Sequence, residues 1–458
     1  MPEQAGPAPS GGPPQPPTAD LPDPGIRTPA PGERERTTLL RGASLVDVAA
    51  GEVRRGVDVL VAGGRVERVG PGLDAAGAEV VGLAGRYVMP GLISLHVHPG
   101  MMVGLRMDPN GQSPERIKRD LQVWLRYGVT TVQAMGTDRA FTFDLQREQR
   151  QGAFLGARLF SVGHGFGLEG GVPQFKMDPP GPVRFAEPEA INRVIDDLAE
   201  QGASGVKIWY DDWYGQLPKM APEVARTIIE ACRRTGLTSY AHVYRVDDAK
   251  LLIGFGLEVL AHMPRDRTAD RELIELMRQR GTAVIPTLTV PESNIAFVDR
   301  PAWVDDPLFG RFLPPASREY LRDEAFLASI RAKPEFPELR PDLERASRNV
   351  GLLYEGGVRF GFGTDAGVSN RVIGFAEHRE LELLVRAGVR PADALRMASL
   401  DAARILGQEP ILGEIAPGRS ADLLVLRANP LEDVKNTRAI EAVWLEGIRA
   451  CGSPTSVA

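Results

Sequence analysis

The sequence predicts an α/β fold, namely a (β/α)8 TIM barrel with a small composite β-sandwich domain made from the N- and C-terminal segments. Two observations support this prediction. Apolar strand candidates alternate with amphipathic helix patterns through the middle of the chain, and eight such strands can be counted. Short alternating segments separated by turns occur at both ends and indicate antiparallel strands. The 458 residues, 43% hydrophobic and 25% charged, are ordinary for a globular protein with a large core.

The two ends of the chain carry the predicted β domain and its tails. Residues 1–36 hold 11 of the 38 prolines and five glycines, which predicts a disordered Pro-rich tail or, alternatively, a polyproline II ligand. Residues 37–89 and 410–450 are expected to pair into one β-sandwich, because neither segment alone has enough strands to close a core. Residues 451–458 are expected to form a C-terminal tail.

Residues 90–409 are expected to form the barrel. Its helix patterns close on glycine, as in residues 222–236 and 269–281. A doubly wound open sheet is the competing architecture, but no GxGxxG fingerprint follows the first strand. Residues 290–350 are the one irregular stretch and are expected to cap the barrel mouth. The strand candidates end near His98, Gly136, Gly163, Trp209, Tyr244, Met263, Leu288 and Asp365.

Charge and cysteine content exclude several classes of function. Lys and Arg total 54 against 60 Asp and Glu, and the net charge of -6 argues against nucleic acid as a partner. Cys232 and Cys451 are too few for a thiolate metal cluster, so a metal would need His and carboxylate ligands. No apolar run reaches the roughly 18 residues of a membrane span, and no secretory signal pattern is present. We therefore expect a cytoplasmic protein with a small-molecule substrate and no membrane partner, with a homo-oligomer left open.

The first and last predicted barrel strands carry candidate metal ligands. His96 and His98 stand at the end of an apolar strand, and their i, i+2 spacing puts both imidazoles on one face. Asp365 follows the last of the eight strands, which lies beside the first in a closed barrel. These three residues are therefore predicted to share one cation.

Two further histidines and a lysine extend the predicted centre. His242 and His262 end strands one βα unit apart and would fill a second metal position. Lys207 is expected to point into the barrel, where burial and nearby dications favour its neutral amine. Such an amine can add carbon dioxide, and the resulting carbamate could bridge two metal ions. An ion pair with Asp211 or Asp212 is the alternative for this lysine.

In these motifs the chain resembles the metal-dependent amidohydrolase superfamily, over residues 37–450. The motifs are PGLISLHVH, VKI, AHV, LAH and GTD at successive strand ends, followed by LGEIAPGRSADLLVLRANPLEDV. Within the superfamily the sequence is most similar to the imidazolonepropionase-related, prolidase-like branch, whose binuclear members hydrolyse dipeptides or N-acyl amino acids. The resemblance implies that His96, His98 and Asp365 hold one metal, that His242 and His262 hold the other, and that carbamylated Lys207 bridges.

The expected activity is hydrolysis of an amide or related C–N bond in a dipeptide, N-acyl amino acid or cyclic amide. Two divalent ions, expected to be zinc, would supply a hydroxide, and Asp365 would carry the proton to the leaving nitrogen. Alternatives are a mononuclear deaminase or a lactonase of the same superfamily, and a non-catalytic interaction protein. The deaminase is disfavoured, because no Glu closely follows His242 and the first acid after it in the sequence is Asp247.

Four further side chains complete the predictions. His164 lies in a glycine-rich segment after the third strand, and a substrate contact or proton-transfer role is the hypothesis for it. Tyr240 and Tyr244 flank His242 on the same strand face and are candidates for binding polar ends of the substrate. His378 lies on an amphipathic helix and is expected to be structural.

Overall fold

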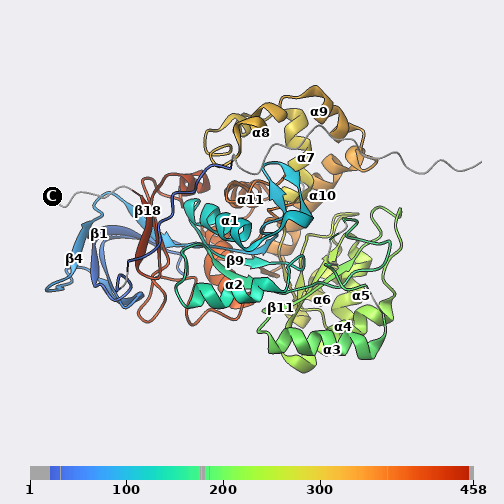
Figure 1. The fold of residues 1–458 in the computed structure, drawn as a ribbon, viewed down its shortest axis with the longest axis horizontal. Coiled ribbons are helices and arrows are strands. Elements are labelled where there is room, and N and C mark those ends of the chain that lie inside the picture. Colours follow the sequence, from blue (N-terminus) through green and yellow to red (C-terminus); the bar gives the residue numbers. More distant parts are fainter. Residues whose placement is uncertain are drawn as a thin grey trace, which may run out of the picture.

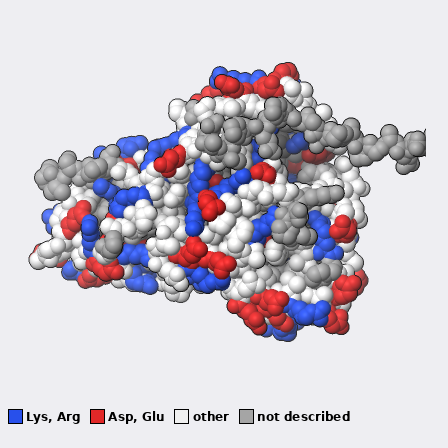
Figure 2. All heavy atoms as spheres, in the orientation of Figure 1, with Lys and Arg blue, Asp and Glu red and all other residues white. Residues whose placement is uncertain are grey.

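The computed structural model describes residues 21–452 except 31, 176, 178–180, 185 and 369. Strands near the two chain ends form a β domain at one side, and parallel strands with flanking helices form the larger part of the molecule (Figure 1). On the face drawn in Figure 2, basic and acidic side chains are interspersed. Among the described helices, none combines the length and the apolar character needed to cross a membrane.

Eight parallel strands form the centre of the larger part. They belong to a three-stranded sheet in the order β10-β9-β6 and a five-stranded sheet in the order β11-β12-β13-β14-β15. Backbone bonds connect the sheets at both edges, since His98 N donates to Ala366 O (2.8 Å) and Phe166 N donates to Lys207 O (2.7 Å). The strands are β6 (Leu92–Val97), β9 (Val129–Ala134), β10 (Arg158–Ser161), β11 (Gly205–Tyr210), β12 (Thr238–Val243), β13 (Val259–Leu260), β14 (Ala283–Val284) and β15 (Arg359–Phe360).

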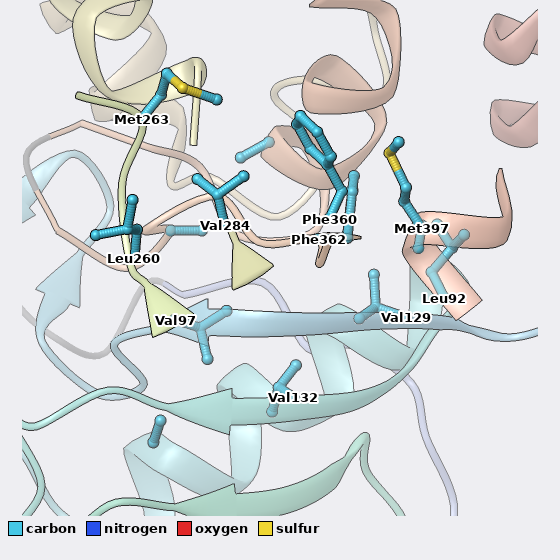
Figure 3. Packing of buried hydrophobic residues seen from close by; sticks show 14 of the residues in the cluster. Leu92, Val97, Val129, Val132, Leu260, Met263, Val284, Phe360, Phe362 and Met397 are labelled. Atoms are coloured by element: carbon cyan, nitrogen blue, oxygen red, sulfur yellow. The ribbon is translucent and has the colours of Figure 1, made fainter. Parts of the chain in front are cut away.

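The central strands are short, and all but β10 and β15 are almost wholly buried, which explains why they read as apolar runs. Figure 3 shows the packing between strands and covering elements, with Leu92 and Val97 from β6 near Val129 and Val132 from β9. The carboxyl ends of such parallel strands meet at one end of the structure, where functional side chains gather in this architecture. The last strand ends at Phe360, five residues before Asp365, and the residues in between still hydrogen-bond to β6.

Amphipathic helices cover the outside of the strands. Helix α4, for example, has Pro222 at its first position and ends at Gly236, whose φ of 74° is the left-handed value favoured by glycine. Its buried face presents Ile228 and Ile229 to the core. The covering helices are α1 (Pro114–Arg126), α2 (Phe141–Arg150), α3 (Pro188–Glu200), α4 (Pro222–Thr235), α5 (Val246–Phe255), α6 (Arg271–Arg280), α11 (Phe375–Arg386), α12 (Pro391–Arg396) and α13 (Ala402–Ile405), with a π-helical turn at Met397–Asp401.

The stretch predicted to be irregular is mostly helical. It packs around its own aromatic cluster, which includes Phe297, Phe309 and Phe326. Pro, Arg and aromatic residues obscured the helical period here, because α7, α8 and α9 are short, with 11, 6 and 8 residues. The segment (yellow to orange in Figure 1) contains α7 (Thr289–Asp299), a 3-10 turn at Ala302–Asp305, α8 (Pro315–Tyr320), α9 (Glu324–Arg331) and α10 (Phe336–Glu355).

One eight-stranded sheet unites the two ends of the chain. Its path runs β18-β17-β16-β5-β1-β2-β3, β4 pairs with β1, and the antiparallel β16–β5 pair joins the N- and C-terminal segments. Alternate residues of β16 face opposite ways, so that Leu423 lies in the small β-domain core and Leu424 in the main core. The strands are β1 (Thr38–Asp47), β2 (Glu52–Ala62), β3 (Arg65–Gly70), β4 (Glu79–Gly82), β5 (Tyr87–Pro90), β16 (Leu423–Leu426), β17 (Ile440–Leu445) and β18 (Ile448–Gly452).

Part of the predicted Pro-rich tail can be described. Residues 1–20 lie outside the described residues, whereas several residues of the segment 21–36 contact the folded body. Ile26 packs against the main core, the carbonyl of Pro22 accepts a bond from Arg119, and Arg34 pairs with Glu446 at 2.7 Å. Proline-rich composition did not prevent docking, because a few apolar and charged side chains suffice to hold an extended segment on a surface.

Candidate metal centre

The first histidine pair stands at the carboxyl end of β6. His96 is 0% exposed and His98 is 5% exposed. The Nδ1 atom of His96 lies 2.9 Å from the Ala261 carbonyl, and Nδ1 of His98 lies 2.8 Å from Thr137 Oγ1. Both Nε2 atoms approach the same carboxylate oxygen, Asp365 Oδ1, at 3.1 and 2.7 Å. The two imidazoles therefore converge with Asp365, as the spacing predicted.

Asp365 is held by its backbone and by an arginine. Its N–H donates to the carbonyl of His96 (2.8 Å), and its φ of 59° is a left-handed value unusual outside glycine. Arg371 donates through Nη2 to Asp365 Oδ2 (2.6 Å) and through Nε to the backbone carbonyl (2.7 Å). Burial raises the pKa of Asp365, but Arg371 and the neighbouring imidazoles outweigh burial and bring the pKa well below its ordinary value.

The second histidine pair comes from β12 and the end of β13. His242 Nε2 lies 2.9 Å from Asp211 Oδ2, and His262 Nδ1 lies 2.7 Å from Thr287 Oγ1. The ring centroids of His242 and His262 are 4.5 Å apart, and those of His96 and His262 are 4.7 Å apart. Each of the four imidazoles thus has one nitrogen oriented by a polar neighbour, the arrangement typical of histidines that bind a metal through the other nitrogen.

Burial keeps these imidazoles neutral. It lowers the pKa of His96 to about 3, and it also lowers the pKa of His98, His242 and His262. The charge of Lys207 acts in the same direction on all four. Neutral imidazole is the form that ligates a cation, so the histidines are prepared for metal binding without first losing a proton.

Lys207 lies inside the barrel beside the histidines. It is 0% exposed, and its Nζ is 3.4 Å from His96 Nε2. Burial lowers the pKa of Lys207 to about 7, although the charge of Asp365 opposes this shift. Two glycines leave room for this side chain, since a Cβ at Gly136 or Gly165 would lie only 2.9 or 3.0 Å from Lys207 Cβ.

The alternative ion pairs of Lys207 are absent among the described residues. Asp211 contacts His242 instead, and Asp212 pairs with Arg245 at 3.0 Å. Lys207 is therefore a buried amine with no carboxylate within ion-pair distance in the described part of the chain. This environment differs from that of a structural salt bridge and leaves the amine available for chemistry.

All six predicted metal-centre residues line one cavity of about 340 Å³. The ligand atoms of His96, His98 and Asp365 lie within 4.8 Å of one another, close enough to surround a single ion. Imidazole and carboxylate donors fit a divalent cation such as zinc, and neither Cys232 nor Cys451 lines the cavity. The residues present therefore fit the metal that the sequence predicted.

The three predicted substrate contacts separate in the structure. Tyr244 lines the cavity, and its hydroxyl donates to Asp342 Oδ1 at 2.9 Å. Tyr240 lies deeper in the barrel, in a buried cluster with Leu95, and does not line the cavity. His164 does not line it either, and its buried Nδ1 has no hydrogen-bond partner among the described residues. Of the three residues, Tyr244 is therefore the one that the structure places at the cavity, and its contact with a substrate stays a prediction.

Sequence reasoning missed the residues that support the ligands. Thr137, Thr287 and Arg371 come from loops after other strands and carry no recognisable spacing to the histidines. The sequence indicates Asp211 as an alternative ion-pair partner of Lys207, whereas the structure places its carboxylate on His242. His378, expected to be structural, is buried and contacts Tyr127 O and Thr437 Oγ1.

Comparison with known proteins shows the family to which the chain belongs. The Amidohydrolase family profile matches residues 87–449. Ochratoxinase from Aspergillus niger is 24% identical over 403 residues, covering 79% of this chain and 75% of that protein.

Solved structures give the same fold. A Xaa-Pro dipeptidase with bound methionine superposes with a TM-score of 0.71 at 23% identity, covering 90% of this chain and 99% of that one. A putative prolidase from Bifidobacterium longum superposes with a TM-score of 0.72 at 24% identity, covering 93% of this chain and 96% of that one. The prediction of an amidohydrolase with prolidase-like relatives and a TIM-barrel-type fold of mixed α and β content is confirmed. The chain belongs to the amidohydrolase family and is a hydrolase of carbon–nitrogen bonds.

Proposed function

We propose that the chain is a binuclear, metal-dependent hydrolase of amide bonds. His96, His98 and Asp365 would hold one divalent ion and His242 with His262 a second, with carbamylated Lys207 between them. The observation that carries this proposal is the convergence of four neutral imidazoles, each with one nitrogen already oriented, on one cavity with a carboxylate and a buried amine. Zinc is the metal we propose, because nitrogen and oxygen donors suit it.

The lysine and the aspartate would perform distinct steps. Neutral Lys207 Nζ attacks carbon dioxide, loses one proton and becomes an anionic carbamate with two oxygen donors. Divalent ions, when bound, supply Lewis acidity that makes water more acidic and polarises a carbonyl. Asp365 takes a proton from the attacking water through a carboxylate oxygen and delivers it to the leaving nitrogen. Arg371 holds that carboxylate in place through its bond to Oδ2.

The substrate class we propose is a dipeptide, an N-acyl amino acid or a cyclic amide. The similar proteins support this class, since they include a Xaa-Pro dipeptidase and a putative prolidase. The aromatic and aliphatic side chains that line the cavity suit an organic molecule with an apolar part. They are Met107, Val172, Phe175, Trp209, Trp213, Val290, Leu339 and Val368.

The alternative activities have weaker support. The resemblance implies that a deaminase would have a Glu a few residues after His242 in the sequence, yet Asp247, the first acid after it, is paired with Arg267 at 2.6 Å outside the cavity. A lactonase remains an alternative for the same centre. A non-catalytic protein is disfavoured because every proposed ligand position holds a suitable side chain.

We propose that the barrel carrying this centre spans residues 90–409 and that residues 37–89 and 410–450 form a β-sandwich. The β16–β5 pairing supports the composite character of the second unit. Cytoplasmic location and a homo-oligomeric state stay predictions.

The variant Asp365→Asn tests the proposed mechanism. Asparagine preserves the shape and one oxygen donor but cannot carry the proton, so turnover of an amide substrate should fall at least about 100-fold. Metal content is measured in the same samples, because the change could also weaken binding of an ion. Turnover near that of the wild type in a fully metallated variant would contradict the role of Asp365.

A further inference from the structure

Arg265 is a buried cation at the rim of the metal-centre cavity. It follows His262 by three residues, lines the cavity and is only 8% exposed. Its backbone is anchored on both sides, because its N–H donates to the carbonyl of Tyr244 (2.9 Å) and its carbonyl accepts from Arg345 Nε (2.6 Å). The guanidinium carbon lies 5.1 Å from the centroid of the Tyr244 ring. Two backbone hydrogen bonds and the contact with the Tyr244 ring therefore hold Arg265 in place.

The guanidinium nevertheless lacks strong partners. Its nearest carboxylate oxygen is Asp342 Oδ2, 3.7 Å from Nε, which is too long for a hydrogen bond. Asp342 already accepts from Tyr214 (2.7 Å), Tyr244 (2.9 Å) and Arg345 (2.6 Å). Within the described part of the chain, Nε of Arg265 is buried without a hydrogen-bond partner. Nη1 donates a long bond to the Met263 carbonyl (3.5 Å), and the ion pair with Asp342 is shared with Arg345. A buried charge that is paired only at this distance is costly, and an anionic ligand would offset that cost.

Two other cations line the cavity besides Lys207. Arg371 is bound to Asp365 in two places, and Lys333 is half-buried near Glu335, whose charge raises the pKa of that lysine against the lowering effect of burial. Among the described residues, no acid of the cavity lining accepts a hydrogen bond from Arg265 or Lys333, and Arg265 is the more deeply buried of these two cations. A planar guanidinium matches a carboxylate through two parallel hydrogen bonds.

Arg265 also lies near the proposed reaction centre. It lines the same cavity as His242 and Asp211 and follows the proposed ligand His262 by three residues. The same cavity is lined by apolar side chains that could accommodate the remainder of a substrate: Phe175, Trp213, Val290, Pro291 and Leu339. The cavity therefore combines a cationic donor with apolar surface, beside the proposed ligands.

We propose, on the basis of the function proposed above, that Arg265 binds a carboxylate of the substrate and selects acids over neutral amides. The substrates would be N-acyl amino acids or dipeptides with a free carboxylate and an apolar remainder. Neutral cyclic amides would be poor substrates. Loss of a charge-assisted pair is expected to weaken binding about 10- to 100-fold.

Binding to the metal-free protein tests this proposal without requiring turnover. The probes are N-benzoyl-L-phenylalanine and L-leucyl-L-proline, each compared with its C-terminal carboxamide by calorimetry. The wild type should bind at least one acid about 10-fold or more tightly than the matching carboxamide. Arg265→Met should bind the two alike, and Arg265→Lys should keep part of the preference because it keeps the charge.

Arg267→Met is the matched control. It removes an arginine two residues further along the chain, which pairs with Asp247 at 2.6 Å and does not line the cavity, so the preference for acids should persist. Thermal unfolding of each variant shows whether it is folded, and Arg265→Lys serves if Arg265→Met is not. No acid preference in the wild type, the same preference in Arg265→Met, or its loss in Arg267→Met would overturn the proposal. Amide hydrolysis by the metal-loaded wild type is measured separately, so failure of the proposed function is distinguished from failure of the Arg265 assignment.

Discussion

Replacing Asp211 by Ala should weaken one of the two metal positions. Asp211 Oδ2 lies 2.9 Å from His242 Nε2, and the carboxylate is held in turn by the Trp213 N–H at 3.1 Å. Burial raises the pKa of Asp211, but the bond to His242 brings it below its ordinary value, so the carboxylate is ionised at neutral pH. It fixes the imidazole with Nδ1 as the free nitrogen.

The expected loss of metal affinity follows from this single hydrogen bond between Asp211 and His242. Loss of a carboxylate partner of a ligating histidine typically costs 10- to 100-fold in metal affinity, or about 1.4 to 2.7 kcal/mol. We expect that loss at the position formed by His242 and His262, with the position formed by His96, His98 and Asp365 changed much less. A titration with zinc in chelator-buffered solution resolves the two affinities.

The neighbouring residue provides the control. Asp212 points away to Arg245 at 3.0 Å and makes no contact with a proposed ligand among the described residues. Asp212→Ala should therefore leave both zinc affinities close to those of the wild type. Equal zinc affinities in Asp211→Ala and wild type would refute the view that this carboxylate orients His242 for metal binding.

Two further variants examine the buried ionisable groups. Lys207→Ala should lower amide hydrolysis at least about 100-fold, and acetate or propionate should restore part of it by replacing the carbamate; an unchanged rate would remove Lys207 from the mechanism. Asp138→Asn should change how stability depends on pH. Burial raises the pKa of Asp138 to about 7, although Ser161 donates to it at 2.7 Å. Its ionisation therefore opposes folding, and wild-type stability should decline between about pH 4 and pH 7 by up to about 4 kcal/mol more than that of the variant. Urea unfolding at pH 4.5 and pH 8 measures this difference, and parallel declines in the two proteins would contradict it.

The convergence of the proposed ligands could be predicted from the sequence because strand geometry is simple. His96 and His98 share a face through the two-residue period, and the strand order of a barrel brings Asp365 beside them. His242 and His262 follow from the same argument, because they stand at the carboxyl ends of two neighbouring strands, β12 and β13. Apolar runs ending in polar residues are therefore sufficient to place side chains at one end of a parallel barrel.

The two-residue period of a strand does not show how deep in the barrel a side chain lies. Tyr240 and Tyr244 both lie two residues from His242, yet Tyr240 is in a buried layer below the centre and Tyr244 lines the cavity. A two-residue step along a strand changes depth by about 6 to 7 Å, which separates core from cavity. Alternation alone therefore indicates the face of a residue but not its layer.

Contacts between distant loops were also beyond sequence reasoning. Arg371 and Thr287 reach the ligands from segments whose paths depend on the whole fold. Arg265 gave no signal in the sequence because its importance lies in partners it lacks, which only the packing around Asp342 reveals. Functional residues that position or select, rather than ligate, depend on tertiary context.

The most direct test of the binuclear assignment is the number of metal ions bound per chain. Protein freed of metal with a chelator, then reconstituted with zinc and bicarbonate and freed of excess metal, is analysed by mass spectrometry for zinc and assayed for amide hydrolysis. The account predicts saturation at two zinc ions per chain, with amide hydrolysis appearing as they bind. Saturation at one ion or none would contradict it.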